Sequence, residues 1–248
     1  MEIIERFATK CPCWSNNVYQ KSIGPDHPDA DSRYQQYYAG KKRLMLHSLG
    51  CPRASADVQA DKWNQTTNNN AIAHAVIDSN DGNVRQTLRW DFRGWHCGNP
   101  GNNSFIGVEM CESDAIKYTS GAKFEVLDKA KAQRHCRTTY TSAVELFAKL
   151  CLMFNCDPLT DILSHNEGRL QGIATAHVDP EHLWNGLGMG YTMDGFRVAV
   201  KAKVDELNAG SGPIYRVQVG AFRNKAYADA FLADVQKTYP KAYLTKGG

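Results

Sequence analysis

The feature of this sequence that most restricts its fold is a series of short apolar segments, each of which ends at polar or turn-forming residues. Residues 43–47 form one such segment, and a turn that contains Gly50 and Pro52 follows it. Residues 72–77 and 84–88 form two more, separated by an Asp-Gly step that favours a β-hairpin. Short apolar segments between turns are typical of buried strands. The sequence therefore predicts a sheet of short strands.

Helical patterns are interspersed with these strands. Residues 104–111 predict a further apolar strand, and residues 139–154 carry apolar side chains at helical spacing. Residues 161–165 predict another short strand, residues 179–184 begin a helix with an acidic residue and a proline, and residues 196–207 predict a closing helix. The expected fold class is α/β, with a central mixed β-sheet flanked by helices.

The two ends of the chain differ from this middle part. Residues 1–42 are polar and lack periodicity, so we expect them to be rich in loops. Residues 208–213 are small and aperiodic, which predicts a linker. Residues 214–248 alternate as a strand, then show helical spacing, and then begin a second strand. The predicted organisation is a main domain over residues 1–207, this linker, and a short β-α-β C-terminal module.

Charge and composition indicate what kind of partner the chain binds and in which compartment it is made. From residue 213 to the end there are six basic and two acidic residues, although the whole chain is only +3. A basic module suggests a polyanionic partner. The sequence lacks an uncharged apolar run of about 18 residues and a signal-peptide pattern at its start. We therefore expect no membrane insertion, and synthesis in the cytoplasm. The eight cysteines contain no CxxC pair and are expected to be mostly buried free thiols.

Three residues combine the chemistry and the position of metal ligands. His47 and His165 each end a predicted strand, and Asp179 opens a helix fourteen residues after His165. Zinc hydrolases commonly use three such side chains and leave a fourth position for water. Taken singly, a histidine at a strand end is more often a hydrogen-bonded structural residue, and an aspartate before proline is first of all a helix cap.

Several segments resemble the N-acetylmuramoyl-L-alanine amidases of the phage-lysozyme and peptidoglycan-recognition-protein type. Residues 44–48 resemble the family's first zinc-ligand strand, and residues 73–82 resemble the hairpin that follows it. Residues 94–99 resemble its substrate-groove loop, and residues 104–109 the strand that carries its catalytic glutamate. Residues 164–167 and 177–180 resemble its two later ligand sites. Together they span residues 43 to 184. The resemblance implies that Zn²⁺ is bound by His47, His165 and Asp179, with Asp179 at a position where some relatives have cysteine.

Two further residues are assigned to catalysis. Glu109 is the candidate base, because strand alternation places it on one face with Gly107, opposite Val108 and Met110. His177 stands where many members of that family carry lysine, and it would stabilise the oxyanion or protonate the leaving amine. A competing assignment makes His177 a metal ligand and leaves the neighbouring aspartate as a helix cap.

Three more residues are candidates for substrate binding. Trp95 could stack on a sugar or peptide face, or it could be a core aromatic residue. His96, beside it, is interpreted as part of the groove wall. His74 shares a strand face with Ile72 and Val76, which favours a packed structural histidine over a direct role.

The tail carries a resemblance of its own. The stretch from Tyr215 to Phe222 resembles a SPOR domain, a wall-glycan-binding module with a βαββαβ layout. Residues 213–248 hold about half of that pattern, so we expect a tail that is truncated, disordered, or completed by a second copy through self-association.

The predicted function is zinc-dependent hydrolysis of the amide bond between N-acetylmuramic acid and L-alanine in bacterial peptidoglycan. A lytic amidase of this kind, a phage or prophage endolysin, would act on the cell wall after release. The predicted partners are peptidoglycan and, through the basic tail, its glycan strands, but not nucleic acid. Two alternatives stay open: a non-catalytic peptidoglycan-recognition protein, and a zinc peptidase that cuts within the stem peptide.

Overall fold

The structure is a computed structural model that describes residues 1–98, 100–210, 220 and 222–238. It divides into two compact units, Met1–Asn208 and Ala209–Gly248, which are described separately. Among the described residues, no helix combines the length and the apolar character needed to cross a membrane.

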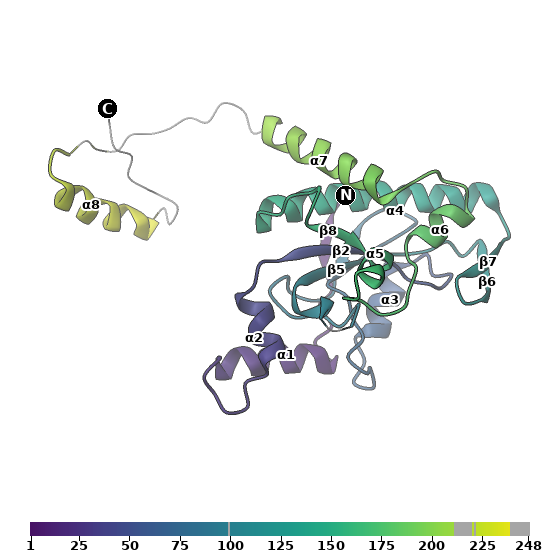
Figure 1. The fold of residues 1–248 in the computed structure, drawn as a ribbon, viewed down its shortest axis with the longest axis horizontal. Helices are drawn as coiled ribbons and strands as arrows, with labels where there is room; N and C mark the ends of the chain where they lie inside the picture. The colour runs from purple at the N-terminus through teal and green to yellow at the C-terminus, as the bar shows by residue number, and fades with distance from the viewer. Residues whose placement is uncertain (99, 211–219, 221, 239–248) are drawn as a thin grey trace. The chain divides into compact units, whose positions relative to one another are not determined.

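The first unit is built on a central sheet of short strands (Figure 1). In spatial order the strands are β1 (Ile3–Glu5), β4 (Val84–Gln86), β3 (Ala75–Ile77), β5 (Phe105–Met110), β2 (Arg43–Ser48) and β8 (Ile162–Ser164). Neighbouring strands run parallel except β3 and β4, which form the predicted hairpin. The sheet is therefore mixed, and the predicted fold class is confirmed.

One face of the sheet is covered by two helices, α4 (Lys129–Phe154) and α7 (Met193–Gly210). Leu46 and Val108 of the sheet share a buried apolar core with Phe147 of α4 and Phe196 of α7. The predicted helices over 139–154 and 196–207 are both present and longer than expected. Helix α4 begins earlier because the Asp128 side chain accepts a hydrogen bond from the Lys131 N–H.

The other face is covered by the N-terminal part of the chain and two short helices. These elements are α1 (Pro12–Ile23), α2 (Ser32–Ala39), α3 (Ala56–Trp63), the 3-10 helix η1 (Gly101–Asn103) and α5 (His165–Leu170). The prediction that residues 1–42 are rich in loops is wrong. Helix α1 buries Cys13, Asn17 and Gln20, so its inward face is polar and has no apolar periodicity. The Asn17 amide donates to the carbonyl oxygens of Cys13 and Arg93, which makes burial of this face tolerable.

Two more elements complete the first unit. Strands β6 (Ile116–Ser120) and β7 (Lys123–Val126) form a separate hairpin that the sequence pattern did not reveal. Helix α6 (Glu181–Gly186) packs next to β7, and a Cβ atom at Gly186 would lie 2.4 Å from the Phe124 ring. The hairpin therefore lies against the segment that follows Asp179.

The second unit contains helix α8 (Lys225–Thr238), which matches the helical spacing predicted for the tail. The predicted strand at residues 242–244 lies outside the described residues, as does most of the one at 215–222. Helix α7 continues to Gly210. The first residues of the predicted linker, 208–210, are thus helical.

Candidate metal centre

His47 is carried to the site by strand β2, which lies between β5 and β8. Leu44 and Leu46 point into the core beneath α4, so alternation directs Met45 and His47 to the opposite face. The residue paired with His47 on β5 is Glu109, which by the same alternation faces the same side. His47 is only 1% exposed.

His165 is placed by a sharp change from strand to helix. Ser164 ends β8 and caps α5: its hydroxyl accepts from the Glu167 N–H, while the Glu167 side chain accepts from the Ser164 N–H. This reciprocal cap fixes His165 as the first residue of α5, next to β2. The residue is 1% exposed.

Asp179 lies in the loop before α6, and it does not cap that helix, which has no side-chain cap. Its carboxylate turns to β2 instead, where Oδ2 accepts a hydrogen bond of 3.2 Å from the Ser48 N–H. The interpretation of Asp179 as only a helix cap therefore fails on geometry. Burial by itself would raise the pKa of Asp179, but His47, His165 and the Ser48 N–H lower it below its ordinary value.

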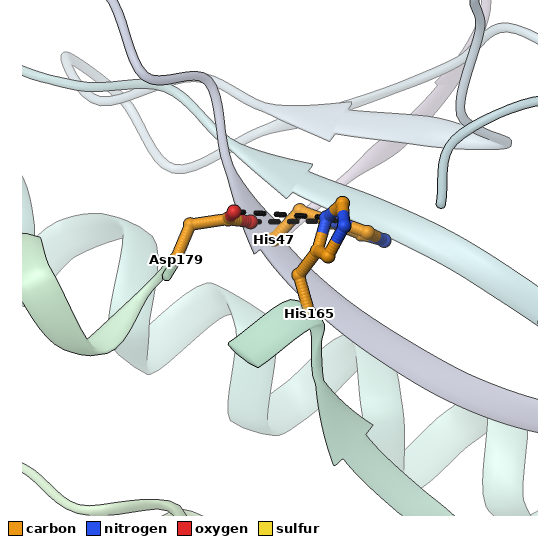
Figure 2. Close-up of side chains that lie close together, drawn as sticks. All are labelled: His47, His165 and Asp179. Atoms are coloured by element: carbon orange, nitrogen blue, oxygen red, sulfur yellow. Dashed lines mark hydrogen bonds and ion pairs between the residues drawn. The ribbon is translucent and has the colours of Figure 1, made fainter. Parts of the chain in front are cut away.

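These three side chains converge on one point (Figure 2). The Nδ1 atoms of His47 and His165 lie 3.0 Å apart. Asp179 Oδ2 lies 3.4 Å from Nδ1 of His47, and Asp179 Oδ1 lies 3.6 Å from Nδ1 of His165. Ligands bound tetrahedrally at about 2.0–2.1 Å, as around zinc, are about 3.3 Å from one another. The three distances bracket that value, so the donor set fits a zinc ion.

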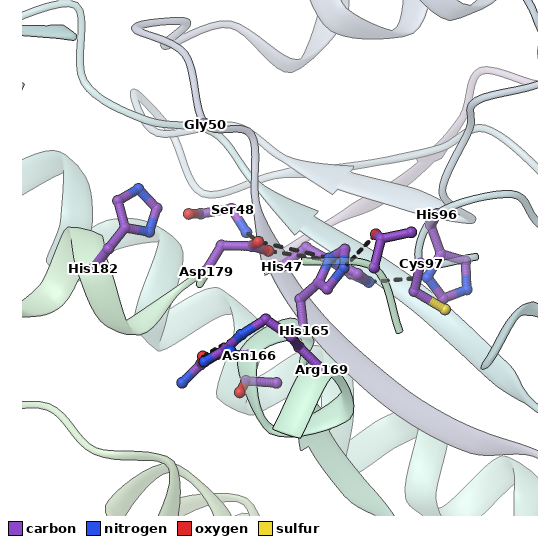
Figure 3. A network of polar contacts seen from close by, with 12 residues as sticks. His47, Ser48, Gly50, His96, Cys97, His165, Asn166, Arg169, Asp179 and His182 are labelled. Carbon is purple, nitrogen blue, oxygen red and sulfur yellow. Dashed lines mark hydrogen bonds and ion pairs between the residues drawn. The ribbon is translucent and has the colours of Figure 1, made fainter. Parts of the chain in front are cut away.

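Hydrogen bonds behind His47 orient its ring (Figure 3). His47 Nε2 lies 2.9 Å from Nδ1 of His96, and Nε2 of His96 lies 3.1 Å from the Phe105 carbonyl oxygen. A carbonyl only accepts, so this network assigns the proton of neutral His96 to Nε2. His96 is neutral because burial holds its pKa well below the ordinary value. Its Nδ1 then accepts from His47 Nε2–H, which leaves a lone pair on His47 Nδ1, facing the cluster.

His165 has a matching arrangement. Its Nε2 lies 3.0 Å from the Thr175 hydroxyl, which can accept a proton from that nitrogen. Burial lowers the pKa of His165 to about 3, so the ring is neutral near pH 7. The Nδ1 lone pairs of His47 and His165 and a carboxylate then face one another. Such an arrangement repels itself unless a cation lies between the donors.

Glu109 lies beside this group on the sheet, paired with His47 in the register of β2 and β5. Its Oε2 atom is buried and has no hydrogen-bond partner among the described residues. Burial, with additional repulsion from Asp179 and Glu112, holds the pKa of Glu109 well above its ordinary value. The predicted strand face of Glu109 is confirmed. Val108 and Met110 lie in the core beneath α4, and Gly107, on the face of Glu109, lies against His96.

His177 lies beside His165, at the edge of the group of donors. It is exposed, and its ring centroid is 4.7 Å from that of His165. Its backbone N–H donates to the Thr175 carbonyl in the same loop. The structure thus brings His177 to the predicted place but outside the group of three buried donors.

The predicted contact of His74 with substrate is wrong. His74 is completely buried, its Nε2 lies 2.7 Å from the Phe92 carbonyl and 3.0 Å from the Tyr37 hydroxyl, and its Nδ1 accepts from the Gly107 N–H. Burial lowers its pKa to about 4. His74 is a packed structural histidine, the alternative that its strand face favoured.

The other two predicted substrate contacts also need revision. Both ring nitrogens of His96 are occupied by His47 and the Phe105 carbonyl, so neither is available to hydrogen-bond substrate. Trp95 is half-buried and lines a different cavity, between the N-terminal helices. The groove wall expected of His96 therefore cannot use its ring nitrogens, and whether Trp95 stacks on a substrate stays a prediction.

Sequence reasoning missed a buried network beside the metal centre. Glu112 is 1% exposed and accepts from the Gly50 N–H and the Tyr118 hydroxyl, at 2.9 and 2.7 Å. That hydroxyl lies 2.6 Å from Nε2 of His182. Burial raises the pKa of Glu112 to about 7. The network depends on the β6–β7 hairpin, which brings Tyr118 to Glu112 and His182. No local sequence pattern predicts that hairpin.

His47 and Glu109 on the sheet, His165 at the start of α5 and Asp179 in the loop before α6 thus place two histidines and two carboxylates on one side of a mixed sheet in an α/β fold, with three donors spaced for a divalent ion. The chain belongs to the N-acetylmuramoyl-L-alanine amidase family, which residues 38–182 match. Residues 211–248 match the SPOR domain. The predicted family, the predicted enzyme class and the SPOR resemblance are confirmed: the chain is a peptidoglycan amidase with a SPOR tail.

Two solved structures are similar to this chain at low identity. The Staphylococcus aureus hydrolase AmiA, solved with its ligand, is 18% identical, with a TM-score of 0.52, over 72% of this chain and 81% of its own. A mutant endolysin from Bacillus subtilis is 21% identical, with a TM-score of 0.49, over 81% of this chain and 99% of its own. A comparison with curated proteins gave no match.

Proposed function

We propose that this amidase cuts the bond between N-acetylmuramic acid and L-alanine, and that its activity depends on a zinc ion held by His47, His165 and Asp179. The observation that carries the proposal is the convergence of the three donors at separations of 3.0 to 3.6 Å, with the lone pairs of both histidines directed inward. Zinc, when bound, lowers the pKa of water to about 7 and polarises the scissile carbonyl.

Glu109 is the base in this proposal. Its carboxylate faces the same side of the sheet as His47, one strand away, and Oε2 has no competing partner among the described residues. A carboxylate whose pKa burial has raised holds a proton better than an exposed one. Oε2 would take the proton of the attacking water and return it to the leaving amine.

His177 supplies a donor from the open side. It lies next to His165 but outside the buried donor group, so its ring can reach the substrate. In that position it hydrogen-bonds the carbonyl oxygen as negative charge develops there. This division of labour assigns Asp179 to the metal and His177 to the substrate.

His96 is a positioning residue in this scheme. By accepting from His47 Nε2–H while donating to the Phe105 carbonyl, it fixes both the tautomer and the orientation of the ligand ring. Thr175 has the same relation to His165. Partners of this kind typically contribute about 10- to 100-fold to metal affinity.

The tail gives the enzyme its second contact with the wall. We propose that residues 1–207 form the catalytic domain and that residues 214–248 bind glycan strands, which the SPOR match and the basic composition support. A lytic enzyme of phage or prophage origin, released from the cytoplasm to the wall, combines these two parts in one chain. Self-association of two chains through this module is a further part of the proposal.

Mass spectrometry of digested wall tests bond, metal and activity together. Purified peptidoglycan treated with the chain should release stem peptides with free L-alanine amino termini, and a chelator should stop the release until zinc is restored. New termini inside the stem peptide would instead identify a peptidase. Binding to the wall without any cleavage would identify a recognition protein.

Zinc titration of two variants tests the ligand assignment. Asp179→Ala should lose the single tight equivalent of zinc, whereas His177→Ala should keep it and lose about 100-fold or more in rate. Tight binding by Asp179→Ala together with loss of binding by His177→Ala would reverse the assignment.

A further inference from the structure

Asp179 is held differently from the other two proposed metal ligands. Strand β2 carries His47, and the capped start of helix α5 carries His165, whereas Asp179 lies in the turn before α6. Two backbone N–H groups hold this residue: Ser48 donates to its carboxylate at 3.2 Å, and Asn166 donates to its carbonyl oxygen at 3.1 Å. Metal ligands need positions fixed to within about 0.5 Å. Further contacts of the segment that carries Asp179 therefore bear on the metal centre.

A chain of hydrogen bonds joins the turn after β2 to helix α6, beside Asp179. Glu112 Oε1 accepts from the Gly50 N–H at 2.9 Å, and Glu112 Oε2 accepts from the Tyr118 hydroxyl at 2.7 Å. The Tyr118 oxygen lies 2.6 Å from Nε2 of His182, a residue of α6. Figure 3 shows Asp179 between His182 and the histidines of the metal centre. The chain of bonds therefore connects the two segments that also meet at the Asp179 carboxylate.

The ring of His182 sets the direction of these hydrogen bonds. Burial lowers the pKa of His182, an effect that Asp179 opposes in part, so the ring is neutral near pH 7. Its Nδ1 atom is buried and has no hydrogen-bond partner among the described residues. Buried N–H groups are left unpaired less often than acceptors, so we place the proton on Nε2. His182 then donates to the Tyr118 oxygen, and the Tyr118 hydroxyl donates to the Glu112 carboxylate.

Ring contacts, and not only these bonds, dock the β6–β7 hairpin on α6. The rings of Tyr118 and Phe124 lie 5.9 and 6.3 Å, centre to centre, from the ring of His182. Phe124 also packs closely against the backbone at Gly186. Tyr118→Phe would keep the ring contacts and lose only the hydroxyl. One substitution can thus separate the packing of the hairpin from the hydrogen-bonded link.

We propose that Tyr118 is a positioning residue for the metal centre: by linking Glu112 to His182 it fixes the start of α6, and with it the Asp179 carboxylate. Among the described residues, its hydroxyl bonds to none of the three proposed ligands, so it acts through Asp179. The two histidine ligands keep partners of their own, so loss of this link affects the third ligand. The inference rests on the proposed function, because it takes Asp179 to be a zinc ligand.

The zinc affinity of the full chain, measured by competition with a chromophoric chelator, tests this role. Tyr118→Phe should weaken zinc binding about tenfold, the lower end of the effect of removing a partner that orients a ligand. His182→Phe breaks the same link from the other side and should weaken binding to the same extent. Tyr38→Phe is the matched control, since Tyr38 is also half-buried and its hydroxyl also has two partners, both on Asn17. It should bind zinc as the unchanged chain does.

The decisive comparison repeats Tyr118→Phe in a chain that carries Asp179→Ala, whose residual zinc binding is weak. Because Tyr118 acts through Asp179, the second substitution should change that residual affinity by less than about threefold. An equal loss in both backgrounds, or no loss in either, would overturn the proposal, since general destabilisation lowers the affinity with or without Asp179. If Asp179→Ala by itself binds zinc as tightly as the unchanged chain, the ligand assignment of the proposed function fails instead.

Discussion

Gly107 lies directly against His96: a Cβ atom at this glycine would be 2.4 Å from the imidazole ring. The missing side chain on β5 therefore gives His96 the space from which it reaches His47 Nε2. The glycine acts on the proposed metal site through two histidines, without touching the metal-binding atoms.

Gly107→Ala should displace His96 and weaken zinc binding about 10- to 100-fold, because His47 loses the group that fixes its tautomer. Competition with a chromophoric chelator measures the affinity. Gly186→Ala is the control, since its Cβ would meet the Phe124 ring at the same 2.4 Å. Equal losses of zinc affinity in both variants would mean that overpacking alone, and not His96, is responsible.

Glu109→Gln should reduce hydrolysis of peptidoglycan by about 10²- to 10⁴-fold, the usual contribution of a general base, and should leave zinc binding within a few-fold. The zinc-free fold should be at least as stable as before, because a half-buried carboxylate, whose buried Oε2 has no partner among the described residues, is replaced by a neutral amide. Rates on purified wall and thermal unfolding provide the two readouts. A variant that keeps its rate within threefold would remove Glu109 from the mechanism.

Glu112 should make the zinc-free protein less stable as the pH rises. Burial raises its pKa from 4.5 to about 7, so between these values the folded chain keeps a proton that the unfolded chain has released. The free energy of unfolding then falls through this window, by about 3 kcal/mol at most, and levels off above pH 7.

Glu112→Gln should remove that dependence, since an amide can still accept from the Gly50 N–H. Urea unfolding at pH 5 and pH 8, with a chelator present, compares the two chains. If both lose the same stability between these pH values, the proton is bound elsewhere.

Two buried tyrosines should differ in how much stability the protein loses when their hydroxyl groups are removed. Tyr37 donates to the Trp90 carbonyl and lies 3.0 Å from His74 Nε2, so Tyr37→Phe should cost about 1–3 kcal/mol of unfolding free energy. The Tyr34 hydroxyl has no hydrogen bond of ordinary geometry among the described residues, and the Trp95 indole is its polar neighbour, so Tyr34→Phe should be close to neutral. Denaturant midpoints at one pH suffice for the comparison, and equal losses would show that Tyr34 has a partner after all.

Much of the fold could be predicted because its strands are short apolar runs that end at polar residues. The ends of two of these runs predicted His47 and His165 as metal ligands, and the Asp-Gly step predicted the β3–β4 hairpin. Helix α1 could not be found in this way, because Asn17 and Gln20 occupy its buried face. Polar residues become acceptable there only when distant backbone groups satisfy them, as the Arg93 carbonyl does for Asn17.

The site was predictable in its ligands but not in the residues around them. His96 has the same local pattern whether it contacts substrate or a ligand, and only the distance to His47 decides between the two. Glu112 follows a strand like many surface glutamates, and its burial depends on a hairpin that ends at Val126. Roles that arise from contacts between distant segments need the three-dimensional structure.

The proposed metal ligands come from widely separated parts of the chain. His47 and His165 are 118 residues apart, and Ser48 and Asp179, which are joined by a hydrogen bond, are 131 apart. An ion held by all three closes a loop through most of the catalytic unit and acts as a reversible cross-link. At a free concentration 100 times its dissociation constant, it would add about 2.7 kcal/mol to the unfolding free energy. A chelator would then expose the chain to proteases as well as stop catalysis.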